Sequence, residues 1–268
     1  MTDILEPPFG GEVPRSVPLM NTPLASVLAQ VRFPEIKKIN TDGNFLAEFQ
    51  EAIRQEYPIS VEETGQLVEV MPDEVKRSTR KAWRFVNAEE TYRVTVASDY
   101  LALETRDYQS KQEFCGRMQT LCLALNATIK PGVMTRIGIR YIDRLYDELF
   151  DQRTEYVNPD FISPFLNEHR ESVIQSTSQM VARTKEGLIG VRWGYLSVGD
   201  SHDAEAMPPL DKESWFVDMD SWVDFDKPVA FDPQAIHDRI CGLSDRAYAV
   251  FRHIVKDALL IACGGELV

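Results

Sequence analysis

The chain is poor in cysteine and lacks any long apolar run. Only four cysteines stand among 268 residues, and none belongs to a CxxC pair. This excludes a disulfide scaffold and a zinc-finger spacing and favours small buried thiols in a reducing compartment. No stretch of 18 apolar residues occurs, and the N-terminus lacks the basic start and apolar run of a signal peptide. The sequence therefore predicts a cytoplasmic globular protein that does not contact membranes.

Positive charge is also in short supply. The 29 lysines and arginines face 42 aspartates and glutamates, so the formal net charge is −13. Such a charge repels nucleic acids and anionic lipids at long range, although it permits a local basic patch. Nucleic-acid binding is therefore disfavoured.

Motifs for catalysis are missing as well. The chain contains no GxSxG, Walker loop, GxGxxG or HExxH. The four histidines are scattered and have no metal-ligand spacing: His169, His202, His237 and His253. We therefore expect no catalytic residue and no cofactor, and a non-enzymatic role is favoured over an enzymatic one.

The most informative stretch that is present is 134–146, MTRIGIRYIDRLY. Apolar residues alternate with Arg136, Arg140 and Arg144, which predicts a β-strand with one packed face. A weaker echo of this pattern lies at 28–33. We interpret both as the first strand of a repeated unit. The predicted domains are therefore an irregular arm at 1–23 and two α+β units at 24–131 and 132–268.

Local signals predict the remaining elements. In the first half they are a strand at 26–33, a helix at 44–56, strands at 60–71, 82–87, 91–97 and 100–106, and a helix at 110–129. In the second half they are the strand at 134–146, a short helix near 159–168, strands at 172–183, 187–197 and 214–225, and a helical region at 232–262 that could break at 242–244. Ser110 and Glu113 form a capping box for one helix, and Asp232-Pro233 begins another. The acidic segment 199–213 is predicted to be an exposed loop.

This order predicts an α+β fold with antiparallel strands. Two tandem β-α-β(3-4)-α units would form one wide, curved sheet with helices on one face. The outline is that of a duplicated saddle of the TATA-binding-protein type, and tandem ferredoxin-like units are the alternative. Fold analogy by itself implies no function.

Three stretches carry a resemblance to a known family: 23–33, 103–108 with Phe114, and 136–145. They resemble a sporadically distributed, uncharacterised family of prokaryotic proteins of about this length. The motif RIGIRYIDRL is the most specific part, and the pattern at 216–220 followed by Ile236-His237 also fits. The resemblance implies no assigned activity, cofactor or catalytic residue.

The arginine row is the first candidate site. Arg136, Arg140 and Arg144 share one face of the 134–146 strand, and Arg32 takes the place of Arg140 in the first half. Guanidinium groups bind carboxylates and phosphates through forked hydrogen bonds, so these residues are candidates for an anion-binding floor. Further candidates for ligand binding are Glu104, Arg106 and Arg192. The alternative is a lattice of ion pairs that the protein satisfies internally.

Carboxylates on the 214–226 stretch supply the partners for that alternative. Asp218, Asp220 and Asp224 alternate there with apolar residues. The same three aspartates are candidates for a Mg²⁺ or Mn²⁺ site, because hard cations prefer oxygen ligands. Arg192 is next to Trp193, and together they could stack a base, although core packing of the aromatic rings is favoured.

These observations lead to three hypotheses for function. The favoured one is a non-catalytic protein that holds a protein partner or an anionic ligand on the concave face of the sheet. The second is a Mg²⁺- or Mn²⁺-dependent phosphohydrolase or nucleotide-processing enzyme. The third is a saddle that binds nucleic acid, which the net charge opposes.

Overall fold

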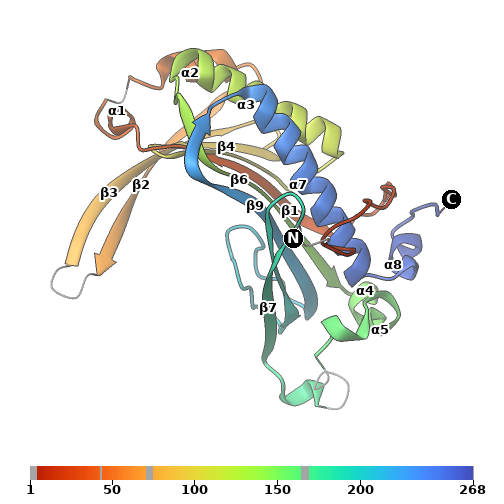
Figure 1. The fold of residues 1–268 in the computed structure, drawn as a ribbon. Helices are drawn as coiled ribbons and strands as arrows, with labels where there is room; N and C mark the ends of the chain where they lie inside the picture. Colours follow the sequence, from red (N-terminus) through yellow and green to blue (C-terminus); the bar gives the residue numbers. More distant parts are fainter. Residues whose placement is uncertain (1–4, 43, 71–74, 164–168, 268) are drawn as a thin grey trace. The chain divides into compact units, whose positions relative to one another are not determined.

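A computed structural model describes residues 5–42, 44–70, 75–163 and 169–267, without the side chains of 65–80 and of Arg170. Nine strands form one antiparallel sheet in the order β2-β3-β4-β5-β1-β6-β9-β8-β7, and several helices accompany it (Figure 1). The predicted α+β class is therefore confirmed. No helix among the described residues has both the length and the apolar character needed to cross a membrane.

The strands are β1 (Leu24–Arg32), β2 (Ile59–Val70), β3 (Val75–Val86), β4 (Tyr92–Ala97), β5 (Tyr100–Thr105), β6 (Val133–Tyr146), β7 (Gln175–Arg183), β8 (Leu188–Leu196) and β9 (Ser214–Ala230). The helices are α1 (Lys37–Thr41), α2 (Ala47–Ile53), α3 (Lys111–Thr128), α4 (Glu148–Asp151), α5 (Arg153–Tyr156), α7 (Pro233–Ile254) and α8 (Asp257–Ala262), with 3-10 turns η1 (Pro159–Phe161) and η2 (Arg170–Ser172).

The chain folds into two compact units. Unit 1 comprises Met1–Val27, Ile139–Trp222 and Gly242–Val268, and unit 2 comprises Leu28–Gly138 and Val223–Cys241. Each unit therefore combines stretches that are far apart in the sequence. The division predicted from the sequence, with boundaries at 23 and 131, stays a prediction.

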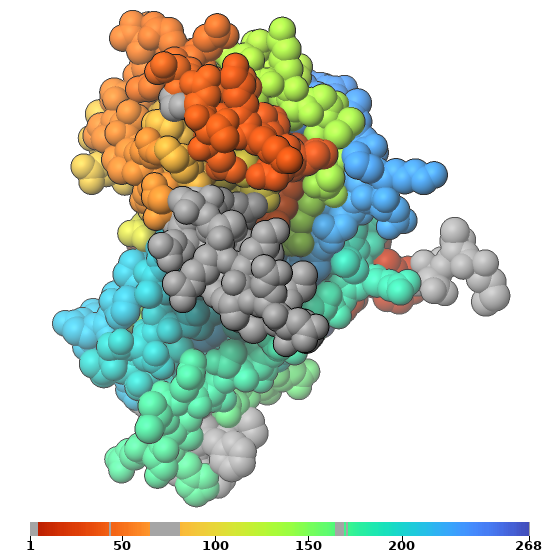
Figure 2. All heavy atoms as spheres, turned by 90° about the vertical axis from the view of Figure 1, so that its left-hand side faces the viewer, coloured from red at the N-terminus to blue at the C-terminus, as the bar shows by residue number. Residues whose placement is uncertain are grey.

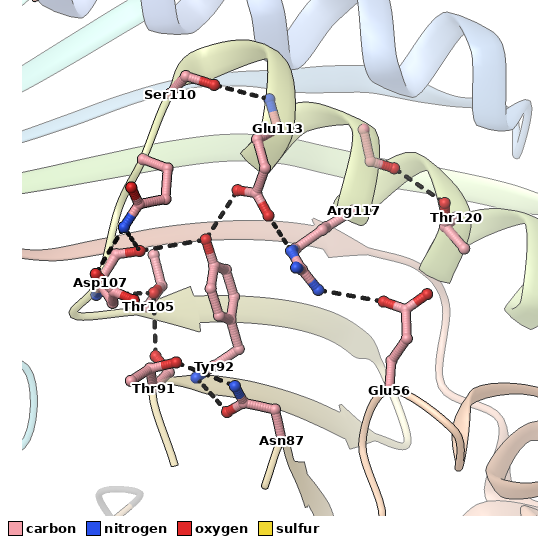
Figure 3. Close-up of polar contacts among 12 residues, drawn as sticks. Glu56, Asn87, Thr91, Tyr92, Thr105, Asp107, Ser110, Glu113, Arg117 and Thr120 are labelled. Carbon is pink, nitrogen blue, oxygen red and sulfur yellow. Dashed lines mark hydrogen bonds and ion pairs between the residues drawn. The ribbon is translucent and has the colours of Figure 1, made fainter. Parts of the chain in front are cut away.

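Helix α3 forms in unit 2 for the reasons that the sequence indicates. The Ser110 hydroxyl accepts a hydrogen bond from the backbone N–H of Glu113, which satisfies a group that the first turn would otherwise leave unpaired. The apolar residues of α3 recur at helical spacing and are buried: Phe114, Met118, Leu121, Cys122 and Leu125. The predicted Ser110 cap and apolar stripe are therefore confirmed, whereas the Glu113 carboxylate accepts from Tyr92 and Arg117 and does not complete the capping box (Figure 3).

The N-terminal arm, which the structure describes from residue 5, lies against α7 in unit 1. The guanidinium of Arg246, which is 1% exposed, donates to the carbonyl oxygens of Pro8 and Gly10 at 2.8 and 2.9 Å. The Tyr248 hydroxyl accepts from the backbone N–H of Val17 at 3.0 Å. Apolar residues of the arm, including Phe9, pack on the core of this unit. Side chains on one helix therefore hold a segment more than 230 residues away in sequence.

Helix α7 corrects the expected break at 242–244. The helix continues without interruption from Pro233 to Ile254, because the apolar residues around Gly242 are buried and outweigh the roughly 1 kcal/mol that a mid-helix glycine costs. The chain leaves the helix only at Val255, which forms an isolated β-bridge with Val157.

One other segment differs from the sequence-based expectation, and a second is described only in part. The short helices α4 and α5, between residues 148 and 156, were not predicted, since each is a single turn with no side-chain N-cap. The described part of the helix predicted near 159–168 contains the 3-10 turn η1. Residues 164–168 lie outside the described residues, so the rest of that helix stays a prediction.

The segment 199–213 is not simply an exposed loop, as the acidic sequence suggested. Its outer side is part of the molecular surface and appears in cyan in Figure 2. Its inner side, however, buries Ala206 and Met207 against Ile142 and Phe216. This burial explains why Phe216 is 0% exposed although the strand alternation places it on the face that was expected to be open. The segment therefore covers part of that face in unit 1.

Candidate functional site

The candidate site is a cluster of charged residues in unit 1, and its centre is the ion pair between Arg140 on β6 and Asp218 on β9. The Arg140 guanidinium binds both carboxylate oxygens of Asp218, with Nε–Oδ1 and Nη2–Oδ2 distances of 2.8 Å. Its remaining terminal nitrogen, Nη1, donates to Asp203 Oδ2 at 2.8 Å. Forked pairs of this kind fix geometry as well as charge. Each of the three guanidinium nitrogens of Arg140 therefore donates to a carboxylate oxygen.

His202 completes this cluster from the 199–213 segment. Its ring stacks on Phe216 with centroids 4.4 Å apart, and its side chain is only 5% exposed. The Nε2 atom lies 2.9 Å from Asp218 Oδ2, while Nδ1 is buried without a hydrogen-bond partner among the described residues. Because Asp218 is held by two groups, it has little capacity left for a third.

The pKa values of Asp218 and Asp203 are both lowered, as this geometry leads one to expect. Burial would raise the pKa of Asp218, but the hydrogen bonds and charges of Arg140 and His202 outweigh burial and hold the pKa below its usual value. The pKa of Asp203 is also lowered, because the N–H of Ala206 and the Arg140 guanidinium outweigh its partial burial. Both aspartates are therefore ionised at neutral pH.

Arg144 lies four residues beyond Arg140 on β6 and anchors the 199–213 segment. Its side chain is 3% exposed and donates to the carbonyl oxygens of Pro208 at 2.6 Å and Asp200 at 3.3 Å, and to Ser214 Oγ at 2.9 Å. Burial lowers its pKa, and the nearby charge of Asp200 only partly opposes this. Arg144 therefore serves the fold of the segment through its bonds to backbone oxygens.

An open pocket of about 500 Å³ lies beside this cluster. It is lined by Gln175, Thr177, Arg192, Ser201 and His202. The strands β7 and β8 approach each other closely here: a Cβ at Gly194 would lie 1.9 Å from the Ser176 carbonyl oxygen, so only glycine fits.

Arg192 differs from the other arginines of the unit in its charge balance. Its backbone is directly opposite Asp218 in the β8–β9 register, so Asp218 is the neighbour that would be expected to neutralise it. Asp218 is occupied by Arg140 and His202 instead. Among the described residues, the exposed Arg192 guanidinium makes no hydrogen bond or ion pair. It is a cation available to a ligand.

The other predicted ligand residues lie elsewhere. Arg32, at the end of β1 in unit 2, is exposed and donates from Nε to Gln30. Arg136 in the same unit pairs with Asp224 at 3.8 Å. Glu104 is 7% exposed and pairs with Arg93. Arg106 is exposed just after β5. In unit 1 the structure thus brings Arg140, Arg192 and Asp218 together. In unit 2 it brings Arg136 and Asp224 together.

The three predicted metal ligands are divided between the two units. Asp218 and Asp220 belong to unit 1, whereas Asp224 belongs to unit 2. Among the described residues, no group of three or more histidine, cysteine, aspartate or glutamate side chains is arranged to hold a metal ion. A site for Mg²⁺ or Mn²⁺ that recruits other ligands stays a prediction.

Sequence reasoning missed half of this site. His202, Asp203 and Ser201 come from the segment that was expected to be exposed, and Gln175 and Thr177 come from a strand with no distinguishing motif. No local signal identifies them, because contacts across 63 to 78 residues place Asp203 and Asp218 at Arg140.

Comparison with known proteins adds no further assignment. No protein-family model, no curated protein and no solved structure matches this chain. Function is therefore inferred from the geometry and chemistry of the site itself.

Proposed function

We propose that this protein binds a small anionic ligand, bearing a carboxylate or phosphate group, in the pocket of unit 1. Arg192 is the anchor, and Gln175, Thr177 and Ser201 supply neutral polar groups around it. The single observation that carries the proposal is the exposed guanidinium of Arg192, whose opposite residue, Asp218, is already neutralised.

The arrangement suits an anion for a physical reason. An arginine presents a planar fork of donors that matches the oxygens of a carboxylate or phosphate. Hydroxyl and amide groups can donate further hydrogen bonds to the same oxygens. Arg140 does not need to move in this scheme, because its charge is balanced and its role is to keep Asp218 away from Arg192.

The His202 ring adds a second polar group at the wall of the pocket. Its Nε2 is held by Asp218, and its buried Nδ1 has no partner among the described residues. A ligand hydroxyl or a protonated phosphate oxygen could satisfy this atom. We infer that the ligand carries at least one hydroxyl in addition to its anionic group, because a hydroxyl can donate to or accept from a ring nitrogen.

Titration calorimetry of the full chain tests the proposal with inorganic phosphate and citrate as probes at constant ionic strength. We expect saturable binding of at least one probe. Replacement of Arg192 by Gln should weaken binding roughly 10- to 100-fold, because a hydrogen bond to a charged group contributes about 1.5–3 kcal/mol.

The matched control is Arg183→Gln, which removes an exposed arginine from the end of the neighbouring strand β7. This variant should bind the probes like the wild type. Equal binding by Arg192→Gln and the wild type, or no saturable binding of either probe, would contradict the proposal. Retention of another protein instead of an anion would favour a protein partner.

We also propose that the fold is an internal duplication of the saddle type, in a cytoplasmic protein. The strand order supports the duplication, since the first strand of each half lies beside the last: β1 next to β5 and β6 next to β9. An experimental structure in which the two halves superpose strand for strand would test it.

A further inference from the structure

Within unit 2, helix α7 carries a cysteine and a histidine on the same face. His237 and Cys241 are four residues apart, so their side chains are neighbours on the helix surface. The Cys241 Sγ lies 3.7 Å from His237 Nε2, which is within hydrogen-bonding reach for a sulfur atom. The adjacent Ile236 and Ile240 are buried, whereas the His237 side chain is 28% exposed. The pair therefore lies where the apolar face of the helix meets solvent.

An aspartate determines which ring nitrogen of His237 faces the thiol with a lone pair. His237 Nδ1 lies 3.1 Å from Asp238 Oδ1. Hydrogen bonds from His237 and from Gln234 hold the pKa of Asp238 below its usual value, so this carboxylate is ionised at neutral pH. An ionised carboxylate can only accept hydrogen bonds. Nδ1 therefore carries the hydrogen of the neutral imidazole, and Nε2 can accept the proton of the Cys241 thiol.

Two glutamines fix the aspartate in turn. Gln234 Nε2 donates to Asp238 Oδ1 at 2.9 Å, and Gln234 Oε1 accepts from Gln119 Nε2 of α3 at 2.8 Å. Because an amide nitrogen donates and an amide oxygen accepts, these two contacts set the orientation of the Gln234 amide. A thiol, a base within its reach and a third group that orients the base form the arrangement by which proteins activate a nucleophile.

The other three cysteines are buried. Cys115, Cys122 and Cys263 are at most 1% exposed, whereas Cys241 is partly exposed. Burial raises the pKa of the Cys122 thiol, and it raises the pKa of Cys263 to about 11. Since the thiolate is the reactive form, burial of this kind makes a thiol inert. Cys241 is thus the exception to the small buried thiols that the sequence predicted.

We propose that Cys241 is a modification site, at which the chain forms a mixed disulfide with a low-molecular-weight disulfide, and that His237 acts as the base. His237 Nε2 takes the thiol proton while Cys241 Sγ attacks one sulfur of the small disulfide. A bond forms between these two sulfurs as the original S–S bond breaks. The second sulfur leaves as a thiolate and takes up the proton from His237. Cys241 is thereby oxidised, and the leaving sulfur is reduced.

Exchange with dithiodipyridine tests the proposal in the full chain at neutral pH. This small disulfide releases a thiopyridone that is followed by its absorbance. We expect one thiol of the folded chain to react faster than the thiols of the same chain unfolded in urea. Cys241→Ser should abolish this fast reaction. His237→Gln should slow it roughly 100-fold, because a positioned base contributes on the order of 100-fold or more to such a step.

The matched control is His253→Gln, which removes an exposed histidine from the last turn of the same helix. This variant should react like the wild type. Loss of folding cannot imitate the expected result, because an unfolded variant would expose all four cysteines and release more thiopyridone. The proposal is overturned by a fast reaction that persists in Cys241→Ser, by equal rates for His237→Gln and the wild type, or by a Cys241 that reacts more slowly than the thiols of the unfolded chain.

Discussion

Each unit contains a polar network built around one arginine, and the two networks differ in how they are assembled. In unit 1, Arg140 receives its carboxylates from residues 63 and 78 positions away. In unit 2, Arg117 binds Glu113, one helical turn earlier on the same helix, and a single distant glutamate, Glu56. The first network is therefore a product of tertiary structure, and the second is largely a product of local structure.

The two networks also differ in how deeply their carboxylates are buried. The Asp218 side chain is 7% exposed, whereas the side chains of Glu113 and Glu56 are 31% and 56% exposed. Removal of one partner from a buried pair leaves a charge that water cannot reach, but a partner at the surface is rehydrated. The same chemical contact should thus have very different effects on stability in the two units.

The largest effect is expected from Arg140→Gln. This change leaves Asp218 and Asp203 without their guanidinium, and we expect a loss of about 3–5 kcal/mol in the free energy of unfolding. Denaturation by urea, followed by tryptophan fluorescence, measures it. A loss below about 1 kcal/mol would show that water reaches the cluster and that the pair behaves like one at the surface.

A second comparison lies within unit 1, between two buried aspartates. Asp218 has a guanidinium partner and a lowered pKa. Asp143 on β6 is 4% exposed, and burial raises its pKa to about 7. The folded protein therefore holds a proton on Asp143 that the unfolded chain releases near pH 3.9. The contribution of Asp143 to the free energy of unfolding is fully present below about pH 3.9 and is lost as the pH rises through about 7.

Asp143→Asn should accordingly stabilise the protein at pH 8, by roughly 2–4 kcal/mol, because it removes a buried charge. The gain should be smaller at pH 5, where the folded protein keeps Asp143 protonated. Urea denaturation at the two pH values measures both quantities. An equal effect at both pH values would mean that Asp143 does not titrate in this range.

A local contact in unit 2 should have a smaller effect. Ser110→Ala removes the N-cap of α3, and we expect a loss of about 1 kcal/mol. Ser110→Gly is the control, since glycine at an N-cap costs only a few tenths of a kcal/mol. Thermal unfolding of the three proteins gives the comparison. Because both variants lack the hydroxyl, the absence of any loss in either of them would indicate that the hydroxyl contributes nothing.

The smallest effect is expected from Arg117→Gln, at most about 1 kcal/mol, because solvent screens this partly exposed pair. The same urea titration that is used for Arg140→Gln measures it. If the two arginine variants lose equal stability, the contrast between the local and the tertiary network is wrong.

The local sequence was sufficient to predict α3, with its Ser110 cap and its apolar stripe, since each of those interactions spans at most four residues or repeats with the helical period. It also indicated the strand that carries Arg136, Arg140 and Arg144, because an alternation of apolar and polar residues with a period of two is visible in a short stretch of sequence. The α+β class followed from the order of such elements.

Only the tertiary structure decided which arginine is available to a ligand. Arg140 and Arg192 are alike in sequence, each on a strand and each next to apolar residues. Their difference depends on the 199–213 segment, which buries Phe216 and delivers His202 and Asp203 to the sheet. A carboxylate can neutralise only the cations within its reach, and the distances that determine this reach are set by contacts between residues far apart in the chain.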